Sequence, residues 1–343
     1  MTVDLRNKKI ALIGGAGFIG HNLALALAAS GADVAVIDSL QVNNLLSFAS
    51  SGGDAPNREF YLRILNERLT LLNAAGIPLH PLDARDYHTL SRVLNQTIKP
   101  QVIVHLAAVA HAGRSNKDPF STFDHSLRTL ENALDWARDK VEQFIFLSSS
   151  MAYGNFHADV VDEDHPLNPI GIYGALKVAG EKMVIAYQQV FDLPYTIIRP
   201  SALYGPRCVS RRVGQMFVEA ALTGRPLRID GDGSDRLDFT YIDDIIQGVA
   251  LAISNPEGRN QVFNVTYGRS RSIAELVGIV RRHFPAVEVE RVDRDILMPE
   301  RGTLSVDKAR RLLGYAPAFD LETGMAKYVD WYRSMGAMAT APG

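Results

Sequence analysis

Cysteine is scarce in this chain of 343 residues, and it lacks both long apolar runs and an excess of one charge. The single cysteine, Cys208, excludes an internal disulfide framework and any zinc site built from several cysteines, and it is typical of a reducing cytoplasm. No apolar run is long enough to cross a membrane. The 36 basic and 38 acidic residues give a formal net charge of −2, which indicates neither a nucleic-acid nor an anionic-membrane partner.

Short apolar runs alternate with helical patterns through the first half of the chain. Each run is bounded by glycine, proline or polar residues, and such alternation indicates right-handed βαβ units in a parallel sheet. The predicted strands are Lys9–Ile13, Asp33–Ile37, Val102–Ala107 and Phe144–Leu147. The predicted helices are His21–Ala29, Tyr61–Ala74, Thr89–Leu94 and Ser121–Arg138. The predicted fold class is therefore α/β, with a Rossmann-type doubly wound parallel sheet.

This pattern is interrupted in three places. Residues Ser47–Asn57 read SFASSGGDAPN, a composition that predicts a loop or a disordered insertion. Beyond about residue 200 the strict alternation ends, and helices are predicted at Val213–Leu222 and Tyr241–Ser254. Residues 336–343 are small, lack periodicity and are expected to form a frayed tail.

A glycine-rich turn between the first predicted strand and helix indicates dinucleotide binding. In KIALIGGAGFIG, residues 9–20, glycines stand at positions 14, 17 and 20. Glycine allows a tight turn, lets backbone N–H groups approach a pyrophosphate, and packs the helix closely on the strand. The helix N-terminus adds positive partial charge. The residues predicted to contact the cofactor here are Gly14, Gly17, Phe18, Ile19 and Gly20.

Two acidic residues downstream extend this prediction. Asp38 ends the second strand 18 residues after Gly20, where a carboxylate binds the hydroxyls of the adenosine ribose. Because a carboxylate repels a 2′-phosphate, the predicted cofactor is NAD rather than NADP. Asp83, in the sequence PLDARD at the end of an expected third strand, either receives the adenine amino group or caps a helix.

The catalytic prediction starts from the segment Tyr173-Gly-Ala-Leu-Lys177. Residues four apart share one face of a helix, so the phenol and the ammonium can point into one cleft. A phenol with its usual pKa of about 10 is a poor base at neutral pH, but a nearby lysine and a positively charged nicotinamide both favour the phenolate. Lowering the pKa by about 3 units requires roughly 4 kcal/mol of differential stabilisation. By itself this motif also occurs on ordinary amphipathic helices.

A serine-rich segment, Ser148–Gly154 (SSSMAYG), directly follows an apolar strand. Substrates bind at strand ends in parallel sheets, and hydroxyl groups there can donate to and accept from a reacting alcohol. The alternative is an ordinary serine-rich turn. The order of the motifs disfavours that alternative: glycine loop, acid, strand-end serines and then Tyr-x-x-x-Lys.

In this order, the residues resemble the extended short-chain dehydrogenase/reductases of the NAD-dependent epimerase/dehydratase family, over nearly the whole chain. Further matching motifs are HLAA at His105–Ala108, IRPSALYGPR at Ile198–Arg207, GDGSDRLDFTYIDD at Gly231–Asp244, FNV at Phe263–Val265 and LGYAP at Leu313–Pro317. The resemblance implies an NAD-binding Rossmann domain over residues 1–200 and a smaller nucleotide-sugar domain over residues 201–335, with chain crossovers between them. It also implies a homodimer formed through helices that include the Tyr-x-x-x-Lys helix.

The resemblance further implies roles for individual residues. Tyr173 is expected to be the catalytic base, Lys177 its partner, and Ser149 the third catalytic member. Arg236 is expected to bind the nucleotide diphosphate, and Arg301, in PERG, a phosphate or ribose. Ala107, Tyr173 and Lys177 complete the expected cofactor site, and Ser149, Ser150, Ser201 and Arg114 complete the expected substrate site.

The residues that flank the catalytic serine favour epimerisation within the family. Similar sugar dehydratases carry an acidic pair at the places held here by Ser150 and Met151. Methionine cannot transfer protons, so dehydration and, similarly, decarboxylation are disfavoured. The predicted function is C4 epimerisation of a UDP-hexose or UDP-hexuronate, with an NAD-dependent nucleotide-sugar dehydrogenase or dehydratase as alternatives. A non-catalytic NAD-binding regulator would be expected to lack Tyr173 or Lys177.

Two stretches, residues 60–86 and 238–249, are similar to UDP-glucuronate 4-epimerases. Arg114, in HAGRS, either meets a substrate carboxylate or phosphate or lies in a solvated loop. Arg211 and Arg212 are either phosphate contacts or a surface pair.

Three residues depart from the family pattern. His125 and Arg128 stand where the family often has asparagine and glycine in N-x-x-G-T, and Ser201 replaces another common asparagine near the nucleotide. These departures leave the hexose open.

Overall fold

Seven parallel strands form the central sheet of the computed structural model, which describes residues 3–49, 57–109 and 112–336. Their order is β12-β7-β5-β4-β1-β2-β3, and every neighbouring pair is parallel. The strands are β1 (Lys9–Ile13), β2 (Asp33–Asp38), β3 (Leu79–Pro81), β4 (Val102–His105), β5 (Gln143–Leu147), β7 (Tyr195–Arg199) and β12 (Gln261–Asn264). The order reverses between β1 and β4, and open α/β sheets bind ligands at such a switch point.

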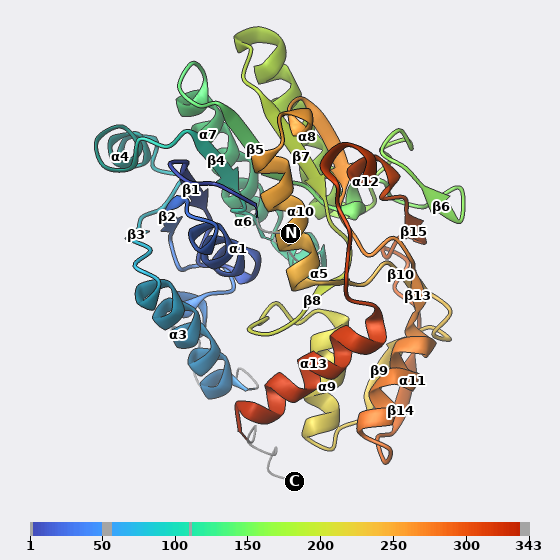
Figure 1. Cartoon of the computed structure of the whole chain (residues 1–343). Helices are drawn as coiled ribbons and strands as arrows, with labels where there is room; N and C mark the ends of the chain where they lie inside the picture. Colours follow the sequence, from blue (N-terminus) through green and yellow to red (C-terminus); the bar gives the residue numbers. More distant parts are fainter. Residues whose placement is uncertain (1–2, 50–56, 110–111, 337–343) are drawn as a thin grey trace.

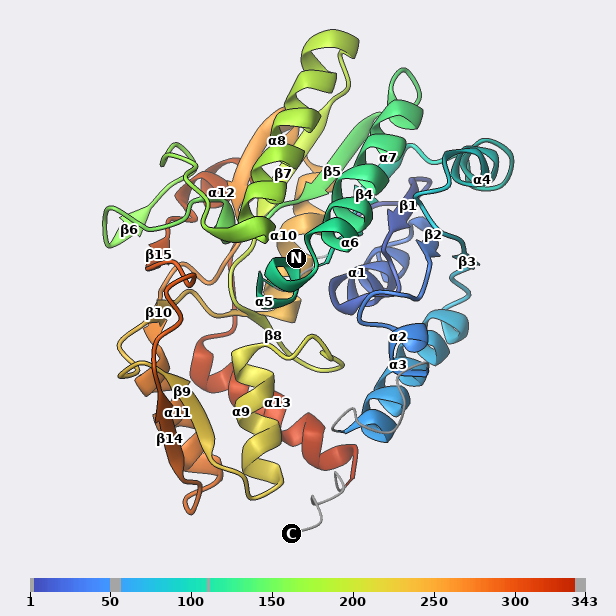
Figure 2. The ribbon, with the colours of Figure 1, turned by 180° about the vertical axis from the view of Figure 1, so that it is seen from behind.

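Successive side chains of β1 face opposite helix layers. Ile10 and Leu12 pack with α1 (Phe18–Ala29) and α10 (Ile242–Ser254), whereas Ala11 and Ile13 pack with α7 (Thr129–Ala137) and α8 (Gly171–Phe191); all four are fully buried. Figure 1 shows α1 and α10 on one face of the sheet, and Figure 2 shows α7 and α8 on the other. A sheet covered on both faces explains the continuous apolar runs in the sequence.

The remaining helices connect and extend these layers. They are α2 (Leu45–Ala49), α3 (Arg58–Ala74), α4 (Tyr87–Val93), α5 (Ala112–Lys117), α6 (Pro119–Phe123), α9 (Val213–Leu222), α11 (Ile273–His283), α12 (Asp307–Leu313) and α13 (Leu321–Ser334). Four small two-stranded sheets pair β6 (Val160–Val161) with β15 (Thr303–Leu304), β8 (Leu203–Tyr204) with β11 (Thr240–Tyr241), β9 (Leu227–Asp230) with β14 (Val289–Val292), and β10 (Arg236–Leu237) with β13 (Arg271–Ser272).

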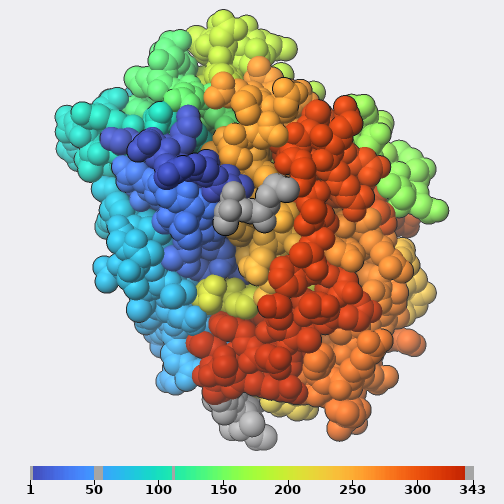
Figure 3. Space-filling view, in the orientation of Figure 1, coloured from blue at the N-terminus to red at the C-terminus, as the bar shows by residue number. Residues whose placement is uncertain are grey.

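The second half of the chain contributes to two regions. Helices α9, α11 and α13 gather with β9 and β14 below the central sheet in Figure 1. In contrast, β12 joins the edge of the central sheet, and α10 packs on α1. In the space-filling view, the blue N-terminal part and the orange and red C-terminal parts share one continuous face (Figure 3). The chain therefore crosses between the two regions, and a domain boundary at residue 200 stays a prediction.

Several predicted element boundaries require correction. The predicted loop Ser47–Asn57 is wrong at its start, because residues up to Ala49 belong to α2; residues 50–56 lie outside the described part of the chain. Local bonds stabilise this short helix, since the Asn44 side chain accepts from the backbone N of Leu45 at 2.9 Å. The predicted helix Ser121–Arg138 contains a π-helical turn, η2 (Asp124–Arg128), between α6 and α7. Of the predicted tail, only residue 336 is described.

Candidate active site

Two glycines of the loop between β1 and α1 have no room for a side chain. At Gly14 φ is +82°, and a Cβ would lie 2.6 Å from the backbone N of Ala107. At Gly20 a Cβ would lie 2.5 Å from the Cα of Gly15. Gly17 precedes α1 in extended conformation, with no side chain capping the helix. The first N–H groups of α1 are therefore left without a side-chain cap at an end that attracts anions.

Replacing Gly20 by alanine is expected to lower the free energy of unfolding by about 1–3 kcal/mol, because the new methyl group meets backbone atoms that cannot move aside. Gly278 on α11 is a matched control: a Cβ added there would meet nothing within 4 Å, so alanine is expected to stabilise by up to about 1 kcal/mol. Urea unfolding followed by circular dichroism measures both effects. Equal effects of the two substitutions would contradict this steric account of the loop.

Asp38 ends β2, and its carboxylate is fixed by two backbone groups. Oδ2 accepts from the N of Ala16 in the glycine loop at 3.0 Å, and Oδ1 accepts from the N of Leu40 at 2.7 Å. Burial raises the pKa of Asp38, against the lowering effect of these two bonds and of the Arg68 charge. The carboxylate thus ties the glycine loop to the end of β2.

Asp83 lies two residues beyond β3 and is paired with a cation. The Nε of Arg85 donates to Asp83 Oδ1 at 3.0 Å, and the same guanidinium reaches Asp124 at 2.7 Å. Burial acts to raise the pKa of Asp83, but the hydrogen bonds from Arg85 outweigh it and hold that pKa below its usual value. The alternative that Asp83 caps a helix is wrong, because Asp86 caps α4 by accepting from the N of Thr89.

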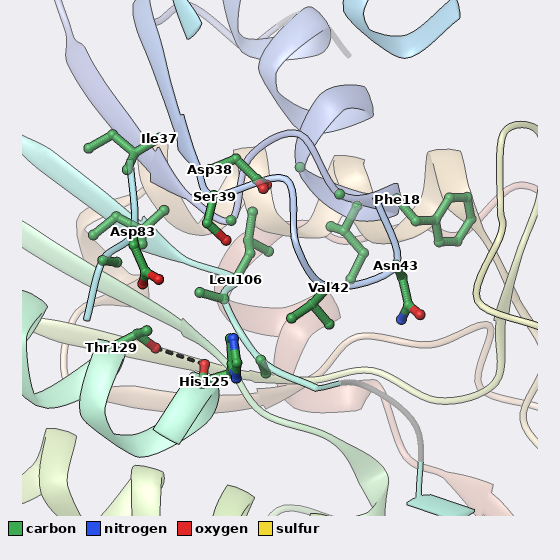
Figure 4. Close-up of a pocket in the computed structure, with 18 of the residues that line it drawn as sticks. Phe18, Ile37, Asp38, Ser39, Val42, Asn43, Asp83, Leu106, His125 and Thr129 are labelled. Carbon is green, nitrogen blue, oxygen red and sulfur yellow. Dashed lines mark hydrogen bonds between the residues drawn. The ribbon is translucent and has the colours of Figure 1, made fainter. Parts of the chain in front are cut away.

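These residues line one cavity at the switch point of the sheet (Figure 4). All the predicted cofactor residues of the glycine loop and strand ends line it: Gly14, Gly17, Phe18, Ile19, Gly20, Asp38, Asp83 and Ala107. Figure 4 shows Asp38 and Ser39 on one side and His125 and Thr129 on the other. Other residues that were not predicted to contact the cofactor also line the cavity, among them Ser39, Val42, Asn43, Thr129, Ser210 and Arg212.

His125 is a cavity residue that could have been found from the sequence. Its Nδ1 lies 2.8 Å from the carbonyl oxygen of Ser121, and its own carbonyl accepts from Thr129 Oγ1 at 3.0 Å. Both His125 and Thr129 fall within the N-x-x-G-T pattern. His125, which stands where the family pattern often has asparagine, is therefore a residue of the cavity wall.

The three predicted catalytic residues gather where β5 ends and α8 begins. Ser149 follows β5, and its Oγ accepts from the N of Met151 at 3.2 Å. Lys177 Nζ lies 5.8 Å from the centroid of the Tyr173 ring and donates to the carbonyl of Leu147 at 2.6 Å. A hydrogen bond with Ser149 also acts on the Tyr173 phenol. One turn of α8 and the end of β5 thus bring a hydroxyl, a phenol and an ammonium together.

Burial dominates the pKa values of the phenol and the ammonium. It raises the pKa of Tyr173, against the positive charge of Arg212 and the hydrogen bond with Ser149. It lowers the pKa of Lys177 to about 8, against the negative charge of Glu181. In this structure the cation whose charge acts on the Tyr173 phenol is therefore Arg212, and the role of Lys177 as partner of the base stays a prediction.

A buried ion pair supports the strand ends beneath these residues. Arg199 on β7 and Glu181 on α8 approach to 2.7 Å, with side chains 4 % and 1 % exposed. Ser148 donates to the same carboxylate, and Arg199 also donates to the hydroxyl of Tyr153 at 2.9 Å. The network joins β5, β7 and α8, the three elements that position Ser149 and Tyr173.

Replacing Glu181 by glutamine is expected to lower the free energy of unfolding by about 3–5 kcal/mol, because it leaves the Arg199 guanidinium charged and unpaired in the interior. Glu142 offers the matched control, since its pair with Lys8 is half-exposed, and Glu142→Gln is expected to cost less than about 1 kcal/mol. Chemical unfolding of both variants measures the difference. A loss at Glu181 no larger than that at Glu142 would show that the buried pair does not support the site.

The predicted substrate residues other than the catalytic-site serines lie in three places. Arg236 and Arg301 line a common cleft. The Nε of Arg301 is buried and has no hydrogen-bond partner within the described part of the chain, whereas Arg236 is bonded to Ser270 at 3.1 Å. Ser201 is buried two residues beyond the end of β7, and Arg114 is exposed on α5. The structure thus brings the two predicted phosphate-binding arginines together and leaves Arg114 apart from them.

The fold and this arrangement define an NAD-binding enzyme of the short-chain dehydrogenase/reductase type. Residues 10–266 match the NAD dependent epimerase/dehydratase family, and the chain belongs to this family. The family is NAD-dependent, and the cavity fits the cofactor: its glycines leave no room for side chains, a helix N-terminus faces it, and Asp38 lies at its rim.

Known relatives are similar over nearly the whole chain. The chain is 32 % identical to the UDP-glucose 4-epimerase of Mycolicibacterium smegmatis over 327 residues, which cover 94 % of this chain and 97 % of that protein. The crystal structure of UDP-glucuronic acid 4-epimerase from Bacillus cereus, with UDP-glucuronic acid and NAD, is 25 % identical with a TM-score of 0.83, covering 95 % and 99 % of the two chains. A dTDP-glucose 4,6-dehydratase from Streptomyces venezuelae is 27 % identical with a TM-score of 0.83, covering 95 % and 97 %.

Proposed function

We propose that this protein epimerises a UDP-hexose or UDP-hexuronate at C4. The observation that carries the proposal is the convergence of Ser149, Tyr173 and Lys177 at the end of β5, in a chain that also holds an NAD cavity. The similarity to a UDP-glucose 4-epimerase and a UDP-glucuronic acid 4-epimerase supports the same reaction.

The proposed chemistry begins with proton removal. Tyr173 takes the proton of the C4 hydroxyl, while Ser149 forms a hydrogen bond with the same oxygen. Held by the glycine loop and the end of β2, NAD would supply an acceptor for the C4 hydride and a donor for its return. The keto sugar turns its other face in between, and Tyr173 then gives the proton back to the oxygen. No net oxidation occurs, so no second redox partner is required.

The substrate contacts proposed for this reaction come from both halves of the chain. Arg236 and Arg301 would bind the diphosphate, which suits the unpartnered Nε of Arg301. The hydroxyls of Ser149, Ser150 and Ser201 would contact the sugar. Arg114 is the proposed contact for a sugar carboxylate or phosphate.

A dehydratase is the second candidate, and the similarity to a dTDP-glucose 4,6-dehydratase favours it. The residues at Ser150 and Met151 count against it, because neither carries a carboxylate and both are buried beside Ser149. A net NAD-dependent dehydrogenase would release NADH, and a non-catalytic NAD-binding regulator would turn over nothing.

Proton NMR of the anomeric signals tests the proposal. The purified protein is incubated with UDP-glucuronate, UDP-glucose and UDP-N-acetylglucosamine, with no added cofactor. The expected result is a new C4-epimer signal from one of them. A product lacking the C6 hydroxyl would show a dehydratase, and absorbance near 340 nm that appears only with added NAD would show a dehydrogenase. No product from any of the three would contradict the proposal for these sugars.

We further propose a cytoplasmic homodimer that pairs through the region of α8. Exposed apolar side chains near that helix support the dimer: Phe120 and Phe123 on α6 are 83 % and 48 % exposed, and Val190 on α8 is 70 % exposed. Within the described ranges, no helix is long and apolar enough to span a bilayer. Light scattering during gel filtration would give the mass in solution, and a monomer would contradict the dimer.

A further inference from the structure

The wall of the cofactor cavity carries one basic side chain of the lysine or arginine type. Within the described residues, Arg212 is the only such side chain that lines it, and the lining carboxylates are those of Asp38 and Asp83. A bound dinucleotide would place its anionic diphosphate against this wall. The N-terminus of α1 offers it only a partial positive charge. The charge balance of the cavity therefore depends on Arg212.

Arg212 has no partner for a buried part of its guanidinium. Its Nε is buried without a hydrogen-bond partner in the part of the chain that the structure describes. Two other buried arginines differ: Arg199 is paired with Glu181, and Arg68 donates to the carbonyl of Arg207. Because buried polar groups are normally hydrogen-bonded, an unpartnered N–H on a cavity wall indicates a binding group.

The loop that carries Arg212 belongs to the second half of the chain but is fastened to the first half. The Nε of Arg207 donates to His21 on α1 at 2.9 Å, and Arg68 on α3 donates to the carbonyl of Arg207 at 3.0 Å. Arg211 takes a left-handed φ of +53°, and Arg212 follows as the N-cap of α9 in extended conformation. The loop is thus fastened to α1 and α3 at Arg207, and it ends at Arg212 where α9 begins.

We propose that Arg212 binds the diphosphate of NAD, so that the second half of the chain closes the cofactor site that the glycine loop opens. Ser210, on the same loop, lines the cavity with it. The charge of Arg212 also opposes the rise that burial causes in the pKa of Tyr173, which indicates that the guanidinium lies within electrostatic reach of the catalytic end of the site. Its neighbour Arg211 is exposed and does not line the cavity.

The test measures binding to protein freed of NAD, and it does not depend on turnover. Calorimetry gives the dissociation constants of NAD, ADP-ribose, adenosine and UDP for wild type, Arg212→Gln, Arg212→Lys and Arg211→Gln. Arg212→Gln is expected to weaken the binding of NAD and of ADP-ribose by about 10- to 100-fold, the range for the loss of a hydrogen bond to a charged group. Arg212→Lys is expected to lose less of this affinity, and Arg211→Gln is expected to bind both ligands as wild type does.

Three results would overturn the proposal. One is an NAD constant for Arg212→Gln within about twofold of wild type. Another is an equal loss for adenosine and ADP-ribose, which would indicate a general distortion of the cavity. A third is a loss confined to UDP, which would assign the arginine to the substrate diphosphate. If Arg212→Gln does not fold, the same comparison is made with Arg212→Lys.

A wild type that binds NAD but converts no UDP-sugar would refute the epimerase function and leave this inference intact.

Discussion

Tyr173→Phe is expected to reduce turnover by about 100- to 10,000-fold, the usual contribution of a positioned acid–base group, while NAD remains bound. The substitution removes only the phenolic oxygen. The ring, 5.8 Å from Lys177 Nζ, stays in place, so neither the fold nor the cofactor cavity should change. Initial rates by NMR and the NAD retained after gel filtration measure the two effects separately.

Tyr187→Phe is the matched control for this variant. Tyr187 lies on the same helix, α8, and its ring centroid is 5.3 Å from that of Phe191. Removing the Tyr187 hydroxyl is expected to leave turnover unchanged. Tyr173→Phe with more than about a tenth of the wild-type rate would contradict the assignment of the base. Loss of NAD from Tyr173→Phe alone would assign the phenol to cofactor binding.

The pH dependence offers an independent check of the same residue. Burial raises the pKa of Tyr173, so the phenol is protonated at neutral pH when the cofactor is absent. A phenol that must lose its proton to act as a base becomes competent as pH rises, and wild-type turnover is expected to rise with pH through the neutral range. The residual activity of Tyr173→Phe should lack this dependence.

Features with short-range causes were predictable from the sequence. The strand Lys9–Ile13 has the predicted bounds, because five apolar-rich residues followed by a glycine turn leave few other conformations. Asp38 lies at the cavity as expected, since a strand end and a glycine loop on neighbouring parallel strands must meet at one edge of the sheet. The i, i+4 spacing likewise placed Tyr173 and Lys177 on one side of α8.

Features that depend on distant residues were not predictable. Chain crossovers between the domains were expected, but not which segment would cross: strand β12, from the second half of the chain, pairs with β7 in the central sheet. Arg212 was left as either a phosphate contact or a surface residue, because its place depends on bonds from Arg207 and Arg68 that span about half the chain. For Asp83, the sequence could not tell a cavity carboxylate from a helix cap, since Asp86 offers the same cap three residues later.

Asp38→Ala is expected to weaken NAD binding by about 10- to 100-fold and to reduce the preference for NAD over NADP. The carboxylate has two roles that the structure lets us separate. It accepts from the backbone N of Ala16 and of Leu40, which orders the glycine loop, and its negative charge repels a 2′-phosphate. Alanine removes both, so affinity and discrimination should fall together.

Asp38→Asn separates the two roles, because its carbonyl oxygen can still accept one of these bonds while the charge is lost. We expect it to lose less NAD affinity than Asp38→Ala and to relax the NAD preference to a similar extent. Asp33→Ala, exposed at the start of the same strand, is the matched control and should bind both cofactors as wild type does. Dissociation constants for NAD and NADP measured by calorimetry decide the case. An unchanged ratio in both Asp38 variants would show that this carboxylate orders the loop without facing the ribose, and cofactor choice would then have to come from Ser39 or Asn43 on the same wall.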